Sequence, residues 1–156
     1  MSVRIYTDGS AKGNPGPGGY GIVLLSDEGH RKELAKGYRK TTNNRMELLS
    51  VIVALEMLKS RPTDVLVYSD SKYVVDAVEK KWVFNWEKKY FDKKKNVDLW
   101  KRFLIIYRQH NVKFFWVKGH ANNVENERCD KLAVAAAEAE QHHDIDKGYE
   151  DQNSSL

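Results

Sequence analysis

A long, strongly apolar segment at residues 43–60 constrains the fold most, because most of its surface must be buried. The segment NNRMELLSVIVALEMLKS has the length of a helix and is followed by Arg61-Pro62, where proline prevents a helix from continuing. The short apolar run DVLVYSD at residues 64–70 comes next and is typical of a buried strand. A strand that follows a crossover helix lies parallel to a neighbouring strand. The segment therefore predicts an α/β domain with parallel strand pairing.

Other strand-like runs surround this segment. VRIYTD, YGIVLL and KELAKGYRK precede it, and three consecutive strands predict an antiparallel meander. VKFFWV at residues 112–117 predicts a fifth strand. Helical patterns occur at residues 71–81, 82–89, 97–110 and 124–140. The 156 residues, of which 41% are hydrophobic, are enough for one domain with a single core.

The run GPGGYG at residues 16–21 formally matches the G-x-G-x-x-G pattern of dinucleotide-binding proteins. In those proteins the glycines open a helix whose N-terminus faces a pyrophosphate. Here the run leads into the strand-like segment YGIVLL instead. We therefore interpret the run as a hairpin connection and expect no nucleotide cofactor there.

Charge is unevenly distributed along the chain, whose net charge is +4. Residues 79–102 hold nine lysines and arginines against four acids, whereas residues 138–156 hold six acids against one lysine. A basic body suits a polyanionic partner such as nucleic acid. We expect the polar, acidic stretch at residues 141–156 to be a disordered tail. The single cysteine and the lack of an apolar span or signal peptide predict a cytoplasmic protein.

Four acids stand at positions where either chemistry or local structure could explain them. Asp8 follows a strand-like run, where it could close an Asx-turn. Glu47 could pair with Asn44 in a helix capping box, and Asp70 could cap the next helix. Asp130 flanks the apolar stripe of the last long helix. Taken one at a time, these residues leave both interpretations open.

Taken together, several motifs resemble type 1 ribonuclease H in their order and spacing. The resemblance runs from about Val3 to Ala137, and the later segment DKGYE is similar too. The segment KKWVFNW followed by NVDLW resembles the basic protrusion of that family. The motifs that carry the resemblance are YTDGSAKGNPGPGGYG, TTNNRMELLSVIVALEML, SDSKYV and WVKGHANNVENERCDKLAVAAA.

The resemblance implies an α/β ribonuclease H-like fold, in which a five-stranded mixed sheet, a three-stranded antiparallel meander plus two parallel strands, is flanked by helices. It places a single ribonuclease H domain at residues 1–140, with the basic protrusion at about 80–100. It also implies an endonuclease that cleaves the RNA strand of RNA/DNA hybrids. The family's catalytic and metal-binding carboxylates and its mobile catalytic histidine then correspond to Asp8, Glu47, Asp70, Asp130 and His120.

Substrate contacts are also implied by the resemblance. They fall on Asn14, Thr42, Asn43 and Asn44, on Lys72, on the protrusion residues Trp82 and Trp86, and on Lys93, Lys94 and Lys95. Two departures from the family pattern concern affinity: Lys72 stands where bacterial relatives tend to have glutamine, and the protrusion after Trp86 is several residues shorter. Without the resemblance, the lysines could be a solvated face and the asparagines helix caps.

The expected cofactor is Mg²⁺, for which Mn²⁺ could substitute, because carboxylate oxygens are hard ligands and no zinc-like Cys/His group occurs. Two ions bound with substrate would activate water and stabilise the departing oxygen, leaving 5′-phosphate and 3′-hydroxyl ends. We expect a monomer that binds an RNA/DNA hybrid and no membrane. Two other classes remain in view: a non-catalytic hybrid-binding module, and a DNA-cleaving nuclease of the same fold. An uncharged residue at any of the four acid positions would favour the module, and the NNRME and KGH motifs favour the ribonuclease branch.

Overall fold

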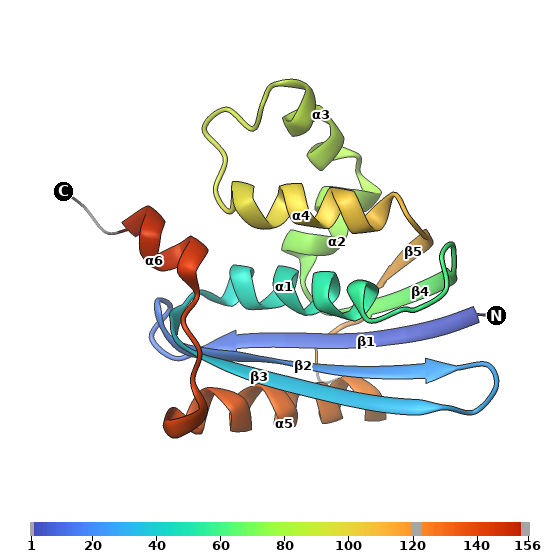
Figure 1. Ribbon diagram of the computed structural model, residues 1–156, viewed down its shortest axis with the longest axis horizontal. Helices are drawn as coiled ribbons and strands as arrows, with labels where there is room; N and C mark the ends of the chain where they lie inside the picture. Colours follow the sequence, from blue (N-terminus) through green and yellow to red (C-terminus); the bar gives the residue numbers. More distant parts are fainter. Residues whose placement is uncertain (1, 120–122, 154–156) are drawn as a thin grey trace.

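The computed structural model describes residues 2–119 and 123–153. The elements, in chain order, are β1 (Ser2–Ala11), β2 (Gly16–Ser26), β3 (Arg31–Thr41), α1 (Asn43–Glu56), β4 (Asp64–Ser69), α2 (Lys72–Glu79), α3 (Trp82–Lys88), α4 (Val97–Tyr107), β5 (Asn111–Trp116), α5 (Val124–Glu138), the 3₁₀ turn η1 (Glu140–His142) and α6 (Lys147–Asn153), as Figure 1 shows. Within these residues, no helix has the length and apolarity needed to cross a membrane.

The five strands form one mixed sheet in the order β3-β2-β1-β4-β5. β1, β2 and β3 pair antiparallel, whereas β4 pairs parallel to both β1 and β5. The antiparallel meander and the parallel strands expected from the sequence are thus confirmed. α1 is the crossover that returns the chain from β3, at one edge of the sheet, to β4, which lies beside the central strand β1 (Figure 1).

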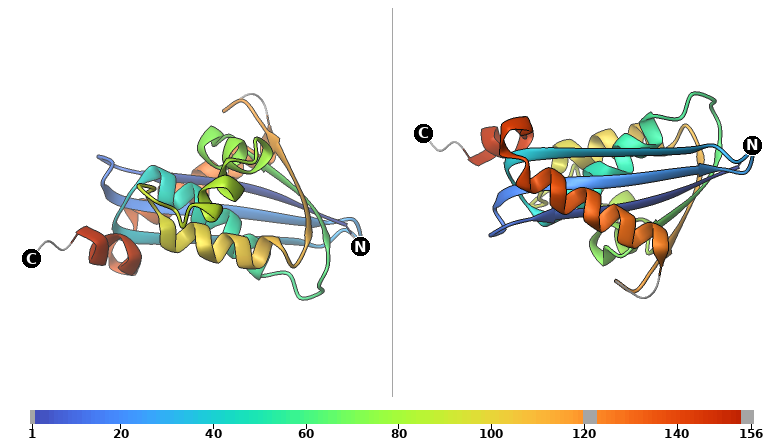
Figure 2. Two further views of the ribbon diagram at one scale, coloured as in Figure 1. Left: turned by 90° about the horizontal axis from the view of Figure 1, so that it is seen from above. Right: turned by 90° about the horizontal axis from the view of Figure 1, so that it is seen from below.

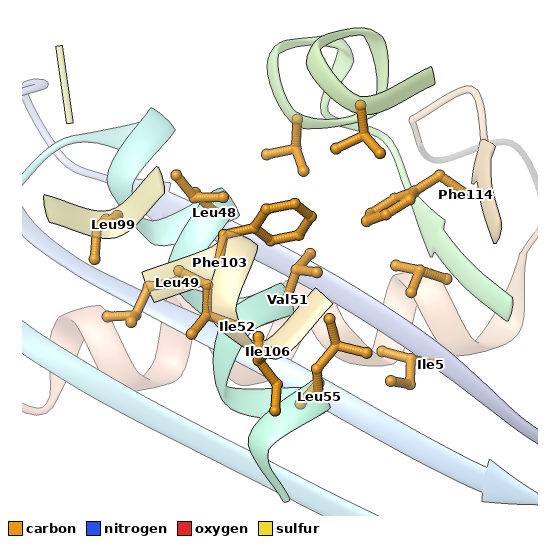
Figure 3. Packing of buried hydrophobic residues seen from close by; sticks show 14 of the residues in the cluster. Ile5, Leu48, Leu49, Val51, Ile52, Leu55, Leu99, Phe103, Ile106 and Phe114 are labelled. Carbon is orange, nitrogen blue, oxygen red and sulfur yellow. The ribbon is translucent and has the colours of Figure 1, made fainter. Parts of the chain in front are cut away.

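The main core lies between one face of the sheet and the helices above it. α1 packs directly on the sheet, and α4 packs on α1 from the other side (Figures 1 and 3). This double burial explains why α1 is apolar almost all round, since a helix that is covered on both sides needs no polar face. Trp100 and Phe103 of α4 are fully buried in the core cluster to which the apolar residues of α1 also belong.

α5 covers the opposite face of the sheet, across β1, β2 and β3 (Figures 1 and 2). Its buried residues are Cys129, Ala133 and Ala137, of which two are alanines that permit close contact with the strands. The thiol of Cys129 donates to the carbonyl oxygen of Tyr6 at 3.2 Å. The cysteine is therefore a buried structural residue, as its apolar surroundings in the sequence indicate.

Two strands are longer than the sequence pattern predicted. β1 continues past Gly9 to Ala11, because Gly9, Ser10 and Ala11 remain paired with β2. β2 already begins at Gly16, so the GPGGYG run belongs to a strand and the interpretation as a hairpin connection is wrong. Gly19 and Gly21 serve helix packing instead: a Cβ at Gly21 would collide with the carbonyl oxygen of Cys129 in α5, and one at Gly19 with that of Ala133.

The acidic C-terminal stretch also differs from expectation, because η1 and α6 extend the ordered chain to residue 153. Asp144 forms a parallel bridge with Tyr38 of β3 and an ion pair with Lys36. Glu150 pairs with Arg39 through two hydrogen bonds of 2.8 and 2.9 Å. Composition alone predicted disorder, but basic residues of β3, far away in the sequence, neutralise these acids.

Candidate active site

Two central strands carry a pair of aspartates to the same edge of the sheet. β1 and β4 are parallel, and their register ends with Tyr6 opposite Tyr68. Asp8 and Asp70 each lie two residues further along their chains. Adjacent parallel strands therefore place both carboxyl groups at the carboxyl ends of the strands, where open α/β sheets bind ligands.

Glu47 joins this pair from the second turn of α1. The helix approaches β1 closely, because a Cβ added at Gly9 would lie only 2.5 Å from the backbone nitrogen of Glu47. One carboxylate oxygen from each of Asp8, Glu47 and Asp70 lies within 4.8 Å of the other two. Three acids that are distant in the sequence thus form one cluster.

Helix capping does not explain these acids. Thr42 is the N-cap of α1, and its hydroxyl accepts a hydrogen bond from the nitrogen of Arg45 at 3.2 Å. Ser71 caps α2 and accepts from the nitrogen of Val74 at 3.3 Å. Asn44 and Asp70, which the sequence offered as caps, do not occupy those positions. The capping alternatives are therefore wrong, and the clustering of Glu47 and Asp70 needs another reason.

Asp130 approaches the cluster from α5, on the other side of the sheet. It lines the same solvent-open cavity of about 450 Å³ as Asp8, Glu47 and Asp70. The close packing of α5 against Gly21, which pairs with Asp8 across β1 and β2, brings it there. Asp130 is not part of the tight three-residue group, but it lies close enough to Asp8 to contribute to the raised pKa of that carboxyl.

The cluster has unfavourable electrostatics when no cation is bound. Burial, followed by repulsion from Asp70, raises the pKa of Asp8 to about 7. Burial and repulsion from Asp8 also raise the pKa of Glu47 well above its usual value. Among the residues that the structure describes, no lysine or arginine forms an ion pair with these acids. Hard oxygen donors with unbalanced negative charge are a donor set that suits Mg²⁺ or Mn²⁺.

Lys72 stands at the edge of this cavity, at the start of α2. Its ammonium group lies over the ring of Trp116, 4.6 Å from the centroid. The indole nitrogen of Trp116 donates to the backbone oxygen of Asp70 at 3.1 Å. Trp116, which the sequence analysis did not single out, therefore links Lys72 to the strand end that carries Asp70.

A second groove, of about 700 Å³, lies beside the first cavity. It gathers five of the expected substrate contacts from three separate parts of the chain: Asn14, Thr42, Asn44, Lys94 and Lys95. Asn44 lines both the groove and the carboxylate cavity. The backbone nitrogen of Asn43 donates a hydrogen bond to Oδ1 of Asn14 at 2.9 Å. The side-chain oxygen of Asn43 accepts one from the backbone nitrogen of Ala11. Asn43 therefore fixes the β1–β2 connection against the start of α1.

The protrusion residues divide between the surface and the core. Trp82 is 44% exposed, with the ammonium of Lys80 lying 5.3 Å from its ring centroid. Trp86 is half-buried against Trp100, and the ammonium group of Lys94 lies over its ring, 5.0 Å from the centroid. Lys93 is exposed and lines neither of the two hollows described above. The structure thus brings Lys94 and Lys95, but neither Lys93 nor Trp82, into the groove.

His120 lies outside the described residues. Gly119, the residue before it, lies beside Asp70, since an added Cβ would be 3.3 Å from Oδ2 of that aspartate. Tyr149 and Gln152 of α6 line the groove as well, although the sequence analysis assigned them to a disordered tail. The family-like segment DKGYE, with its aromatic residue after Gly148, was a local sign that this polar stretch packs against the domain.

Comparison with known proteins agrees with this architecture. The family model described as RNase H matches residues 1–138. A protein named Ribonuclease H from Desulforamulus reducens is 57% identical over 140 residues, which cover 86% of this chain and 87% of that protein.

Solved structures extend the comparison from sequence to fold. LC9-RNase H1, described as a type 1 RNase H with the type 2 active-site motif, superposes with a TM-score of 0.79 at 31% identity, covering 99% of this chain and 82% of that one. LC11-RNase H1, solved in complex with an RNA/DNA hybrid, gives a TM-score of 0.61 at 27% identity over 86% of this chain and 96% of that one. The chain therefore belongs to the ribonuclease H family.

Proposed function

We propose that the protein is an endonuclease that hydrolyses the RNA strand of RNA/DNA hybrids and leaves 5′-phosphate and 3′-hydroxyl ends. The observation that carries this proposal is the group formed by Asp8, Glu47 and Asp70, open to solvent and adjacent to a groove that contains Lys94 and Lys95. One hollow is suited to cations and the other to phosphates. Because a single chain supplies all of these residues, we propose that it acts as a monomer.

Divalent cations fit the carboxylate group for a reason visible in its chemistry. Three clustered carboxyls, two with raised pKa values and none with a basic partner in the described chain, gain most from an external cation. We propose that Asp8, Glu47 and Asp70 hold the ions, with Asp130 at the rim, and that Mg²⁺ is the physiological cation. When bound, two such ions activate a water molecule and stabilise the departing 3′ oxygen.

The remaining residues of the site orient the substrate and move protons. Lys72, held over Trp116, presents a positive charge at the edge of the carboxylate cavity. Asn44 stands where the cavity meets the groove and is suited to hydrogen-bond the minor groove of the hybrid. There the 2′-hydroxyl distinguishes the RNA strand from DNA. We propose that His120 carries a proton to the leaving group, because Gly119 lies beside Asp70.

The groove is suited to the backbone of the DNA strand. Its lining includes Lys94 and Lys95 and no acidic residue. Thr42 at the start of α1 adds a hydroxyl close to the helix N-terminus, a place that favours anions. The complex of LC11-RNase H1 with an RNA/DNA hybrid supports a nucleic-acid ligand for this fold. These observations favour hybrid cleavage over a function in DNA cleavage alone.

Duplexes with one labelled strand test the proposal directly. RNA/DNA, RNA/RNA and DNA/DNA duplexes of one sequence are incubated with Mg²⁺, Mn²⁺ or EDTA. We expect cleavage of only the RNA strand of the hybrid, only with a divalent ion, and products that ligate through 5′-phosphates. Asp70→Asn should bind the hybrid and leave it intact. Cleavage of DNA/DNA, or undiminished activity of this variant, would contradict the proposal.

A further inference from the structure

The C-terminal segment at residues 140–153 is attached to the body of the domain by paired charges. Asp144 accepts a backbone hydrogen bond from Arg39 at 3.0 Å and donates one to Gly37 at 2.9 Å. Its side chain pairs with Lys36 at 2.9 Å, and that of Glu150 pairs with Arg39. These contacts fix the segment along β3, just before the start of α1.

Asp146 anchors the segment in the interior. It is 6% exposed and accepts hydrogen bonds from Thr41 at 2.7 Å and from Arg45 at 2.8 and 2.9 Å. Arg45 is itself buried and also donates to both oxygens of Asp98 in α4, at 2.7 and 2.9 Å. A Cβ at Gly148 would collide with Asp98, so the segment packs directly on this ion pair. One buried arginine thus joins α1, α4 and the C-terminal segment.

This attachment places α6 along the groove beside the carboxylate cavity. Figure 1 shows α6 beyond the start of α1, on the side of the loop that leads into α4. Tyr149 and Gln152 line the groove together with Lys94 and Lys95. Gln152 also donates to Oδ1 of Asp98 at 3.2 Å, which helps to fix its position.

The charge of the segment is arranged so that it does not oppose a phosphate backbone. Of the five acids at residues 140–153, Asp144, Asp146 and Glu150 are paired with lysine or arginine side chains of the body. The other two, Glu140 and Asp151, are not among the residues that line the groove. The residues of α6 that line the groove, Tyr149 and Gln152, are neutral hydrogen-bonding groups. An acidic stretch therefore presents an uncharged, hydrogen-bonding surface to the groove.

We propose that α6 is a wall of the nucleic-acid site, in which Tyr149 and Gln152 bind the sugar-phosphate backbone of the DNA strand. Asp146 is a positioning residue, because it holds α6 against Arg45 without itself lining the groove. The proposal rests on the proposed function and extends its substrate site to a part of the chain that the sequence predicted to be a tail.

A charge introduced at Gln152 tests the proposal. Gln152→Lys should lower KM for the hybrid and steepen the slope of log affinity against log salt by up to about 0.9, the value for one added phosphate contact. Gln141→Lys is the matched control, because Gln141 is exposed in η1 and does not line the groove. We expect Gln141→Lys to leave the slope unchanged. Equal effects of the two variants would overturn the proposal and indicate only a long-range charge effect.

Removing the neutral contacts tests it from the other direction. The double variant Tyr149→Ala/Gln152→Ala should raise KM about three- to tenfold, as expected for one or two lost hydrogen bonds, with kcat and the salt slope unchanged. A thermal melt confirms that each variant is folded, and Tyr149→Phe separates the hydroxyl from the ring. An unchanged KM in the folded double variant would overturn the proposal while the wild type still cleaves hybrids. Failure of the wild type to cleave would instead reject the proposed function itself.

Discussion

At the scale of single residues, Asp8 shows how burial and neighbouring acids disfavour the ionised form of a carboxyl group in the site. Asp8 is 8% exposed and lies near Asp70 and Asp130, so burial and repulsion raise the pKa of its carboxyl to about 7. Folding without a cation therefore places acids where they hold protons more tightly than in the unfolded chain. The free energy of unfolding is therefore lowered by this repulsion in the metal-free state, and it rises again when a cation binds.

This arrangement predicts the pH dependence of stability in EDTA. The folded-state pKa of Asp8, about 7, exceeds its ordinary value of 3.8, so the native state binds more protons between these pH values. The free energy of unfolding should then fall as pH rises from about 4 to about 7. Asp70→Asn should weaken that decline and raise the melting temperature at pH 7. Added Mg²⁺ should stabilise the wild type at pH 7, because it binds the native state.

Urea titrations at several pH values measure this directly, and Asp64→Asn serves as the control because Asp64 is exposed at the other end of β4. A steeper decline in Asp70→Asn than in the wild type would contradict the repulsion. A marked loss of stability in that variant would mean that Asp70 has a structural role after all.

His120 offers a second test at the residue scale. His120→Ala should lower kcat by a factor on the order of 10 to 100 without weakening hybrid binding, as expected for a group that transfers a proton. Isothermal titration with Mg²⁺ distinguishes the alternative. A collapse of metal affinity in this variant would make the histidine a ligand and would contradict its proposed role.

At the scale of elements, the segment between α3 and α4 is expected to affect hybrid affinity and not the chemical step. Lys94 and Lys95 line the groove, whereas Lys93 is exposed and is not among the lining residues. Replacing all three by serine should raise KM and leave kcat nearly unchanged, because none of them lines the carboxylate cavity.

The salt dependence of hybrid affinity in the triple variant indicates how many phosphate contacts these lysines make. Each lost phosphate contact should flatten the slope of log affinity against log salt by roughly 0.9. The position of Lys94 and Lys95 predicts a change of up to about 1.8, with Lys93→Ser alone having no effect. Unchanged KM and slope in the triple variant would leave these lysines as solubility residues. Hybrid binding would then belong to the asparagines and Thr42.

The elements themselves were largely predictable because their signals are local. The apolar period of residues 43–60 predicts α1, and the shift to a short apolar run predicts β4 in parallel pairing. What the sequence could not resolve was the purpose of Gly16–Gly21, because glycines look alike in a turn and beneath a helix. It also could not assign the N-caps of α1 and α2 to Thr42 and Ser71, since several capping residues stand side by side at both places.

At the scale of the whole molecule, Arg45 determines whether the last residues belong to the domain. Its guanidinium is buried and shared between Asp98 and Asp146. Composition and local pattern do not reveal this contact, because about one hundred residues separate Arg45 from Asp146, and only the family-like segment DKGYE marks the place. Composition therefore predicted a tail where the molecule has an integral helix.

Breaking this contact should cost far more than breaking a surface pair. Asp146→Ala removes a buried acceptor and should lower the free energy of unfolding by about 3–5 kcal/mol. Glu150→Gln, at the exposed pair with Arg39, should lower the free energy of unfolding much less, because exposed ion pairs contribute little to stability. Urea unfolding of both variants makes the comparison. Equal losses would show that the buried pair is no stronger an anchor than the surface one.

The close backbone packing at Gly9 and Gly21 has a consequence for how the family's sequences are interpreted. Neither glycine carries a functional group, yet one lies under the helix that bears Glu47 and the other under the helix that bears Asp130. A methyl group added at either position would force the backbone of that helix to shift, and we expect this shift to move the carboxylate while most of the core stays intact. In a deep mutational scan read out by activity, these glycines would therefore score like catalytic residues, and a scan read out by abundance would show a milder effect. Such a difference between the two scans would show that activity depends on the close distance between these strands and the helices that carry Glu47 and Asp130.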